Sequence, residues 1–135
     1  MAQIADIVIS DGAATPVAHI FTPVATSPKA IYREGISNLP LVGQGQAMIG
    51  GGVPGAALQR VKLTLALPAL ETATGANADG YTAAPKVAYT NTVQVEFLLP
   101  SRGTAQQRQD LRVMLSNMLL DTQVIDSVDN LNVPY

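Results

Sequence analysis

The sequence predicts an α+β protein in which an antiparallel sheet precedes two carboxyl-terminal helices. Residues 87–99 alternate between apolar and polar side chains, which is typical of a strand that buries only one face. The apolar side carries Val93, Val95, Phe97 and Leu99. Pro100 ends this strand, and apolar residues then recur at helical spacing. Because the predicted strands all come before the predicted helices, the two kinds of element are segregated.

The chain is predicted to begin with a β-hairpin. Residues 4–10 alternate around Ile7 and Ile9, Asp11 and Gly12 supply a turn, and residues 16–21 return. Three more strands are predicted over residues 29–34, 41–49 and 57–67. The second of these is the weakest, because six glycines lie between residues 43 and 55. The predicted fold is thus an amino-terminal hairpin and an antiparallel sheet of about five strands, followed by the two helices.

The strand over residues 57–67 has two unlike sides. Val61, Leu63, Leu65 and Leu67 point one way. The other side carries Arg60, Lys62 and Thr64, and the same pattern puts Thr90, Thr92, Gln94 and Glu96 together on the long strand. The sheet is therefore expected to have one apolar face and one polar face, the latter either solvated or holding a ligand.

Residues 69–86 form a long loop of mostly small and polar side chains. Loops of this length inside a compact domain are uncommon and are often functional or disordered. After the loop and the long strand, residues 104–107 predict a capping box that opens a helix. Its apolar stripe is Leu111, Met114, Leu115, Met118 and Leu119. A second helix, capped by Asp121 or Thr122, is expected to turn Val124, Ile125, Val128 and Leu131 inward.

Composition excludes several kinds of chemistry. The 135 residues suit one domain, residues 1–135, and the absence of cysteine excludes disulfides, zinc–thiolate sites and thiol nucleophiles. No segment is long and apolar enough for a membrane span, and the amino terminus lacks a secretory signal, so no membrane partner is expected. The only histidine, His19, has no serine or carboxylate motif beside it, so neither an enzyme nor a cofactor is predicted. Asp126 and Asp129 are expected on a solvated helix face rather than in a metal site.

Several segments resemble one known family. Residues 93–100 read VQVEFLLP, and the chain closes on the pattern I-D-x-x-D-x-L-N-x-x-Y from residue 125 to residue 135. The runs at residues 30–34, 40–43 and 60–68 fall in the same order as in that family. This ordered set resembles the coat proteins of small single-stranded RNA bacteriophages, the leviviruses, over nearly the whole chain.

The resemblance implies an intertwined homodimer with a continuous sheet, in which two copies of the long strand pair about a twofold axis. A long unpaired edge is an aggregation hazard, and such pairing would cover it. The family's dimers assemble into an icosahedral virion around the phage RNA in the cytoplasm of the bacterial host. The loop at residues 69–86 would then lie at the symmetry axes of the shell.

The resemblance also gives the polar face a role, the binding of an RNA stem-loop at the replicase start, which represses translation and marks the genome for packaging. The candidate contacts are Arg60, Lys62, Thr64, Thr92, Gln94, Glu96, Gln44, Gln46 and Met48. Cations would neutralise phosphates, and amides, hydroxyls and a carboxylate can read unpaired bases. A net charge of −2 argues weakly against nucleic-acid binding. The alternatives are a solvated sheet face, a non-viral homodimeric RNA-binding module and, with least support, a small-molecule enzyme.

Overall fold

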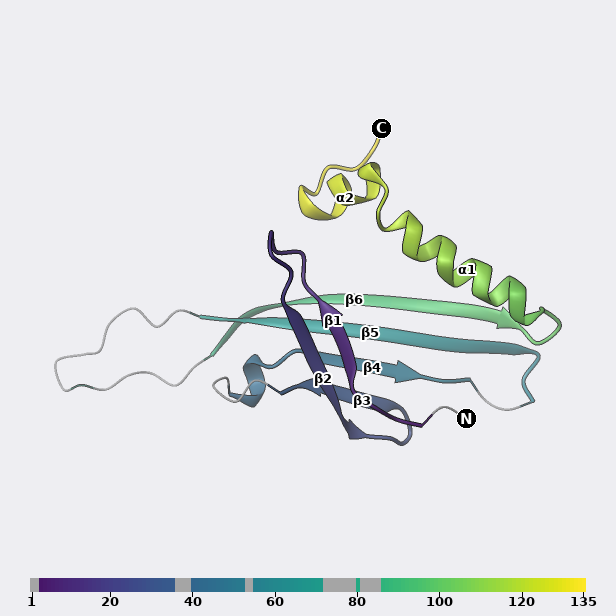
Figure 1. Ribbon diagram of the computed structural model, residues 1–135, viewed down its shortest axis with the longest axis horizontal. Coiled ribbons are helices and arrows are strands. Elements are labelled where there is room, and N and C mark those ends of the chain that lie inside the picture. The colour runs from purple at the N-terminus through teal and green to yellow at the C-terminus, as the bar shows by residue number, and fades with distance from the viewer. Residues whose placement is uncertain (1–2, 36–39, 53–54, 72–79, 81–85) are drawn as a thin grey trace.

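The computed structural model describes residues 3–35, 40–52, 55–71, 80 and 86–135. These residues form one six-stranded antiparallel sheet whose strands follow one another in chain order (Figure 1). The strands are β1 (Ile7–Ser10), β2 (Ala18–Ala25), β3 (Ala30–Glu34), β4 (Gln46–Gly50), β5 (Leu58–Leu70) and β6 (Val87–Pro100). A short 3-10 helix, η1 (Leu41–Gly43), precedes β4, and α1 (Ala105–Met118) and α2 (Thr122–Asp129) follow the sheet. The predicted α+β plan is confirmed, with the hairpin continuous with the sheet.

The long hairpin β5–β6 sets the two faces of the sheet. Its register runs from Leu58 opposite Pro100 to Leu70 opposite Val87. Because residues two apart on a strand share a face, one side of the sheet carries the apolar partners and the other the polar partners. The apolar face is defined by Val61, Leu63, Leu65, Val93, Val95 and Phe97. The polar face is defined by Lys62, Thr64, Thr92, Gln94 and Glu96. The predicted division of both strands is confirmed.

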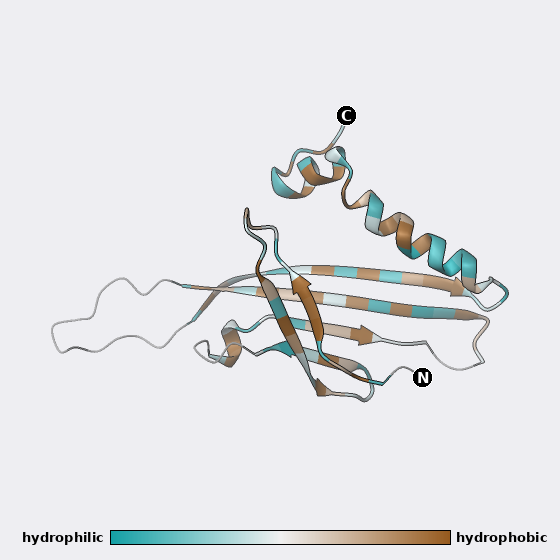
Figure 2. Ribbon diagram, viewed as in Figure 1, coloured by the Kyte–Doolittle hydropathy of each residue, from teal (hydrophilic) through white to brown (hydrophobic). Residues whose placement is uncertain are grey.

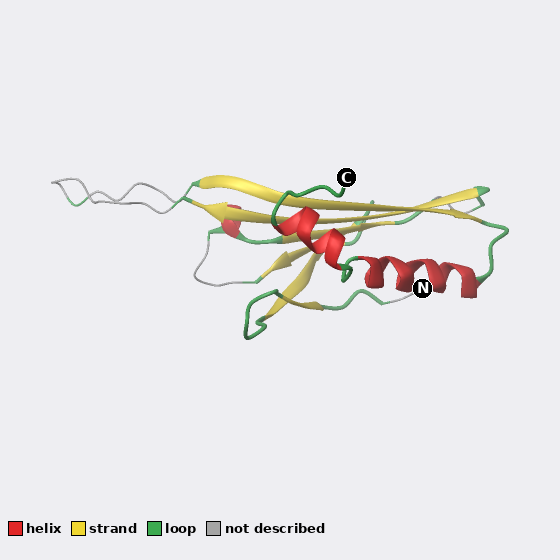
Figure 3. Ribbon diagram, turned by 90° about the horizontal axis from the view of Figure 1, so that it is seen from above, coloured by secondary structure: helices red, strands yellow, loops and turns green. Residues whose placement is uncertain are grey.

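The core lies where the amino-terminal hairpin meets the apolar face. Phe21, Tyr32 and Ala47 are buried, and partly buried side chains such as Ile7 and Leu65 pack against them. Figures 1 and 3 show the hairpin and both helices on the same side of the long strands. The polar face on the other side is covered by no helix or strand among the described residues.

The helices begin where the sequence predicts. Thr104 caps α1 through a capping box, in which its hydroxyl accepts the N–H of Gln107 and the Gln107 side chain accepts the N–H of Thr104. Asp121 caps α2 by accepting the N–H of Gln123 at 2.9 Å. The apolar stripes do not reach a core within the single chain, since Met114 is 68% exposed and Leu131 is 85% exposed. Val124 is half-buried, but Ile125, Val128 and Leu131 are exposed, so the expectation that these three side chains point inward is wrong for the isolated chain.

Several strand boundaries differ from the prediction: β1 starts later, at Ile7, β2 extends to Ala25, and the start of β4 differs most. The strand expected over residues 41–49 begins only at Gln46, because η1 and a segment whose backbone passes close to other elements precede it. A Cβ at Gly43 would lie 2.8 Å from Leu70 Cδ1, and one at Gly45 would lie 3.0 Å from Glu34 Oε2. Both glycines therefore let the backbone pass close to other elements, which local strand propensity does not reveal.

The loop predicted over residues 69–86 is shorter at its start, because β5 continues to Leu70 through pairing with β6. The N–H of Glu71 donates to the carbonyl of Lys86 at 2.8 Å and closes the base of the loop. Residues 72–79 and 81–85 lie outside the described residues, so the role of this loop stays a prediction.

Candidate nucleic-acid interface

The strand registers bring most of the predicted contact residues onto the polar face. Lys62 lies opposite Glu96, Thr64 opposite Gln94, and Ala66 opposite Thr92. On the next strand, Met48 lies opposite Thr64 and Gln46 opposite Ala66. Arg60 shares this face and lies 3.7 Å from Glu96, measured from Nη1 to Oε1, in an exposed pair that contributes little to stability. Gln44 lies just after η1, at the end of the face.

One hollow of the polar face has a volume of about 260 Å³. We call it the Lys62 hollow, and its lining is Lys29, Met48, Gly50, Lys62, Thr64 and Gln94. It combines two cations with the hydroxyl of Thr64 and the amide of Gln94, so it can neutralise a phosphate and hydrogen-bond a base edge. Lys29 is absent from the predicted contacts. Alternation groups Lys29 with Ile31 and Arg33, and the register of β3 with β4 assigns that side to the polar face.

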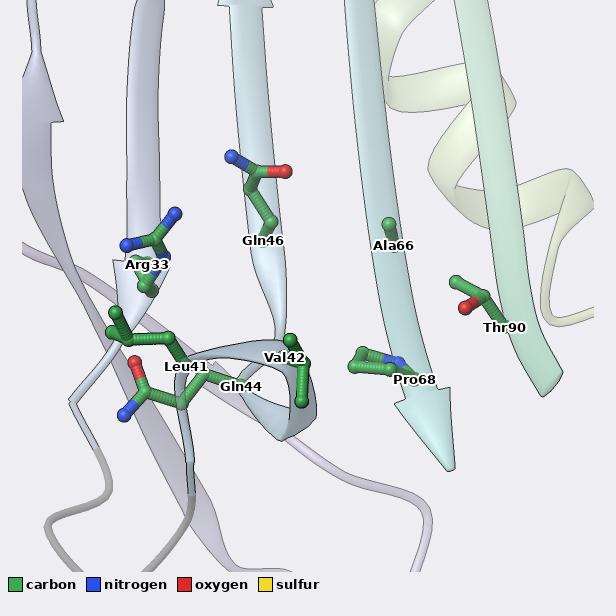
Figure 4. Close-up of a pocket in the computed structure, with 8 residues that line it drawn as sticks. All are labelled: Arg33, Leu41, Val42, Gln44, Gln46, Ala66, Pro68 and Thr90. Atoms are coloured by element: carbon green, nitrogen blue, oxygen red, sulfur yellow. The ribbon is translucent and has the colours of Figure 1, made fainter. Parts of the chain in front are cut away.

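A second hollow, of about 370 Å³, lies at the end of the face next to η1. We call it the Arg33 hollow, and Figure 4 shows its labelled side chains arranged from Arg33 on β3 to Thr90 on β6. It gathers Gln44 and Gln46, which were predicted contacts, with Arg33, which was not. Arg33 lies opposite Gln46 in the register, so strand pairing explains why the two side chains share a site.

The polar face is positively charged although the chain is not. Lys29, Arg33, Arg60 and Lys62 belong to it, and Glu96 is its only carboxylate among the described strands β3 to β6. The chain as a whole has a formal charge of −2. Arg33 on β3 and Lys29 just before it add two cations to those that the sequence places on this face.

The apolar side of the sheet holds a separate cluster of titratable groups. His19 Nδ1 joins Glu34 Oε1, and His19 Nε2 lies 3.2 Å from Asp11 Oδ2. The contact with Glu34, and then that with Asp11, raises the pKa of His19. The N–H of Val17 donates to Asp11 and contributes most to lowering the pKa of that carboxyl. No local motif indicates these carboxylates beside His19, and the described residues bring no nucleophile to it.

Asp126 is a structural anchor rather than a simply solvated acid. Its two carboxylate oxygens accept the side-chain amides of Asn130 and Asn132, each at 2.7 Å. These hydrogen bonds, that from Asn130 first, lower the pKa of Asp126. These contacts hold the carboxyl-terminal tail against α2. Asp126 and Asn132 of the closing sequence pattern are therefore joined by a hydrogen bond. Asp129 is exposed, as expected.

No three histidine or acidic side chains come together as a metal site within the described ranges. In the same part of the chain, no helix has the length and apolar character that a membrane crossing requires.

Several solved structures share this fold over nearly the full length of the chain. Among solved structures, the virus-like particle of bacteriophage ESE058 is 30% identical, with a TM-score of 0.88 over 99% of this chain and 100% of that chain. The bacteriophage GA protein capsid is 14% identical, with a TM-score of 0.76 over 97% of each chain. An unassembled virus coat protein dimer, described as a bacteriophage RNA-binding dimer, is 12% identical, with a TM-score of 0.67 over 99% of each chain. Comparison with curated protein sequences gave no match.

The family assignment rests on the whole sequence. The family model described as levivirus coat protein matches residues 2–135. This match agrees with the six-stranded sheet and the two terminal helices, and it identifies a structural protein family rather than an enzyme family. The chain belongs to the levivirus coat protein family and is a structural protein of the virion.

Proposed function

We propose that this coat protein forms a homodimer through the free edge of β6 and that the dimers assemble into an icosahedral shell. In the described residues β6 pairs only with β5, so its outer edge offers unpaired backbone groups. Figure 2 shows apolar residues along α1, and Met114 and Met118 are more than half exposed. A twofold partner would pair with the edge and cover these side chains in one interface.

The apolar face has room for such a partner. One hollow of about 260 Å³ is lined by Ile7, Ile9, Ile49, Leu63, Val93 and Val95, among others. Another, of about 360 Å³, lies between α1 and the sheet beside Phe97 and Leu99. The helices of a second copy have the exposed apolar side chains that these hollows would bury, and burial yields roughly 25 cal/mol for each Å².

The polar face binds RNA on the inside of the shell. The observation that carries this proposal is the excess of four cations over one carboxylate on an otherwise uncovered face, in a chain whose formal charge is negative. Pairing about the twofold axis doubles this excess. The amide of Gln94 and the carboxylate of Glu96 are suited to reading base edges, while Arg60 and Lys62 supply phosphate contacts.

The proposed RNA is a stem-loop at the replicase start, whose binding represses translation and selects the genome for packaging. Assembly takes place in the cytoplasm of the bacterial host. We also propose that the protein has no catalytic activity of its own.

A titration tests the RNA interface. Arg60→Ala combined with Lys62→Ala should weaken binding of the stem-loop and flatten its salt dependence by roughly one unit for each phosphate that is no longer neutralised. Both side chains point away from the core, so the melting temperature should change little. Dimer should be titrated at two salt concentrations, with Lys86→Ala and Arg102→Ala together as a control that removes the same charge elsewhere. Unchanged affinity and slope in the first variant would exclude these cations from the RNA site.

A further inference from the structure

The Arg33 hollow differs from the Lys62 hollow in position and in chemistry. The two share no lining residue. The Lys62 hollow reaches β5 at Lys62 and Thr64, and the Arg33 hollow reaches it at Ala66 and Pro68. Lys62 and Ala66 are four positions apart, about 13 Å along the strand, so the Arg33 hollow is a neighbouring but separate place on the polar face.

Its chemistry combines a cation with an apolar wall. Arg33 is half-buried on β3, and it takes part in none of the ion pairs between described residues. Arg60, by comparison, lies beside Glu96. A guanidinium in this setting is suited to an anionic oxygen, because it offers several donors in a fixed plane and sits partly out of water.

The apolar wall comes from the turn η1. Leu41 is 66% exposed and Val42 is 56% exposed, although both belong to a hollow on the polar side of the sheet. The turn is fixed by hydrogen bonds from Gly43 N–H to the carbonyl of Pro40, at 2.9 Å, and from Gln44 N–H to the carbonyl of Leu41, at 3.3 Å. The close approach of Gly43 to Leu70 anchors the turn against the end of β5.

We propose that the Arg33 hollow binds one unpaired nucleotide of single-stranded RNA that lies outside the stem-loop. The flat face of the base packs on Leu41 and Val42, and the guanidinium of Arg33 contacts its phosphate. The amide of Gln46, opposite Arg33 on β4, is placed to hydrogen-bond the base edge. The site would let the coat protein hold arbitrary stretches of genome beside its specific hairpin, and it rests on the proposal that the polar face binds RNA.

The probes are hexaadenylate and hexauridylate, two short RNAs without a stem, titrated into purified dimer. Arg33→Gln should weaken binding of both by about 5- to 10-fold and reduce the salt slope by about 0.7, the value for one phosphate contact with a single strand. Arg33→Lys should recover most of the slope, because it keeps the charge. Arg102→Gln, in the turn between β6 and α1, removes one arginine elsewhere and should leave both quantities unchanged.

The preference between the two RNAs tests the role of the apolar wall formed by Leu41 and Val42. Wild-type dimer should prefer hexaadenylate, because a purine offers the larger flat surface. Leu41→Ser combined with Val42→Ser should remove this preference while leaving the salt slope unchanged. Equal binding of the two RNAs by wild-type protein, or a preference that survives the double change, would contradict the placement of the base.

A parallel titration with the bare stem-loop separates this inference from the proposed function. The inference expects Arg33→Gln to leave stem-loop affinity unchanged, while the Arg60 and Lys62 changes reduce it. Stem-loop binding with no effect of Arg33→Gln on either hexanucleotide would overturn the inference alone. Absence of binding to all three RNAs would overturn the proposed function as well. The Arg33 or Leu41 variants could instead lose the dimer, while the fraction that stays dimeric still binds RNA. This result would overturn the inference and show that another copy of this chain occupies the hollow.

Discussion

His19 joins three parts of the chain that are far apart in sequence. Asp11 belongs to the hairpin turn, His19 to β2, and Glu34 to the end of β3, where it is only 7% exposed. Pairing of Phe21 with Glu34 and of Ile9 with His19 brings these groups together. A protonated His19 can satisfy both carboxylates, so the histidine fastens the hairpin to the sheet by charge-assisted contacts.

The cluster predicts a dependence of stability on pH. The pKa of His19 is raised above its ordinary value of 6.5, chiefly by Glu34. Its stabilising contribution is therefore complete below that value and is lost as the pH rises through the raised pKa. The pKa of Asp11 is lowered from 3.8, so its contribution is present above that value and is lost as the pH falls through the lowered pKa.

The melting temperature of the wild type should fall between about pH 5 and about pH 9 as His19 loses its proton. We expect His19→Gln to reduce this fall, because the variant lacks the group that titrates there. Thermal denaturation of the dimer at a series of pH values measures this. Asp126→Asn is the matched control: the pKa of Asp126 is lowered from 3.8, so the carboxyl titrates below this range and the variant should keep the wild-type profile. An identical pH profile for His19→Gln and wild type would show that the cluster does not contribute.

Local patterns could not reveal residues that meet only through the fold. The candidate contacts on β5 and β6 follow from alternation within each strand, and the register places them together as predicted. Arg33 was missed because its membership of the polar face depends on pairing between β3 and β4. Asp11, His19 and Glu34 were missed for the same reason, since nothing in the spacing of a histidine and two acids indicates that a curled hairpin will join them.

At the scale of elements, α1 is a helix whose apolar stripe has no counterpart in its own chain. The capping box and the spacing of the stripe made the helix predictable, and its start is confirmed. The sequence of α1 itself does not indicate which surface covers this apolar stripe. The predicted start of the strand at residue 41 was wrong for a related reason, because the approach of Gly43 to Leu70 is a contact between distant segments.

Met114→Lys should abolish or strongly weaken the dimer, although Met114 is already 68% exposed in the single chain. A lysine there would cost a lone subunit almost nothing, but it would place a charge in the proposed apolar interface. Ser116→Lys, an exposed position on the other side of α1, is the control and should leave the dimer intact. Analytical ultracentrifugation across a range of protein concentrations gives the dissociation constant of each. Equal constants for the two variants would place α1 outside the interface.

At the scale of the whole molecule, the chain is a long, thin sheet with its helices gathered on one side (Figure 3). This form suits a wall one subunit thick, in which dimers share edges and leave the polar face uncovered. The sequence identified this architecture through its ordered resemblance to phage coat proteins. The conformations that the subunit adopts within a shell depend on neighbours, and residues 72–79 and 81–85 are not among those described.

Purified protein should form shells of uniform diameter by negative-stain microscopy. Shortening residues 72–80 should leave dimers intact while changing the yield, size or thermal stability of the shells, because the small side chains of this segment contribute little to a core. Shells that are unchanged in all three respects would remove the loop from assembly. A wild-type protein that remains dimeric at every concentration would contradict the proposed assembly of the dimers into a shell.

The charge of the polar face has a consequence for how finished particles behave in suspension. Four of the eight lysines and arginines lie on that face with Glu96, which leaves four cations against eight carboxylates elsewhere among the described residues. In the proposed shell, with the polar face turned inward, the wall would be electrically two-sided, positive toward the genome and negative toward the medium. Filled particles would repel one another and migrate toward the anode, so the distribution of charge proposed to retain the RNA would also keep the particles colloidally dispersed in dilute salt.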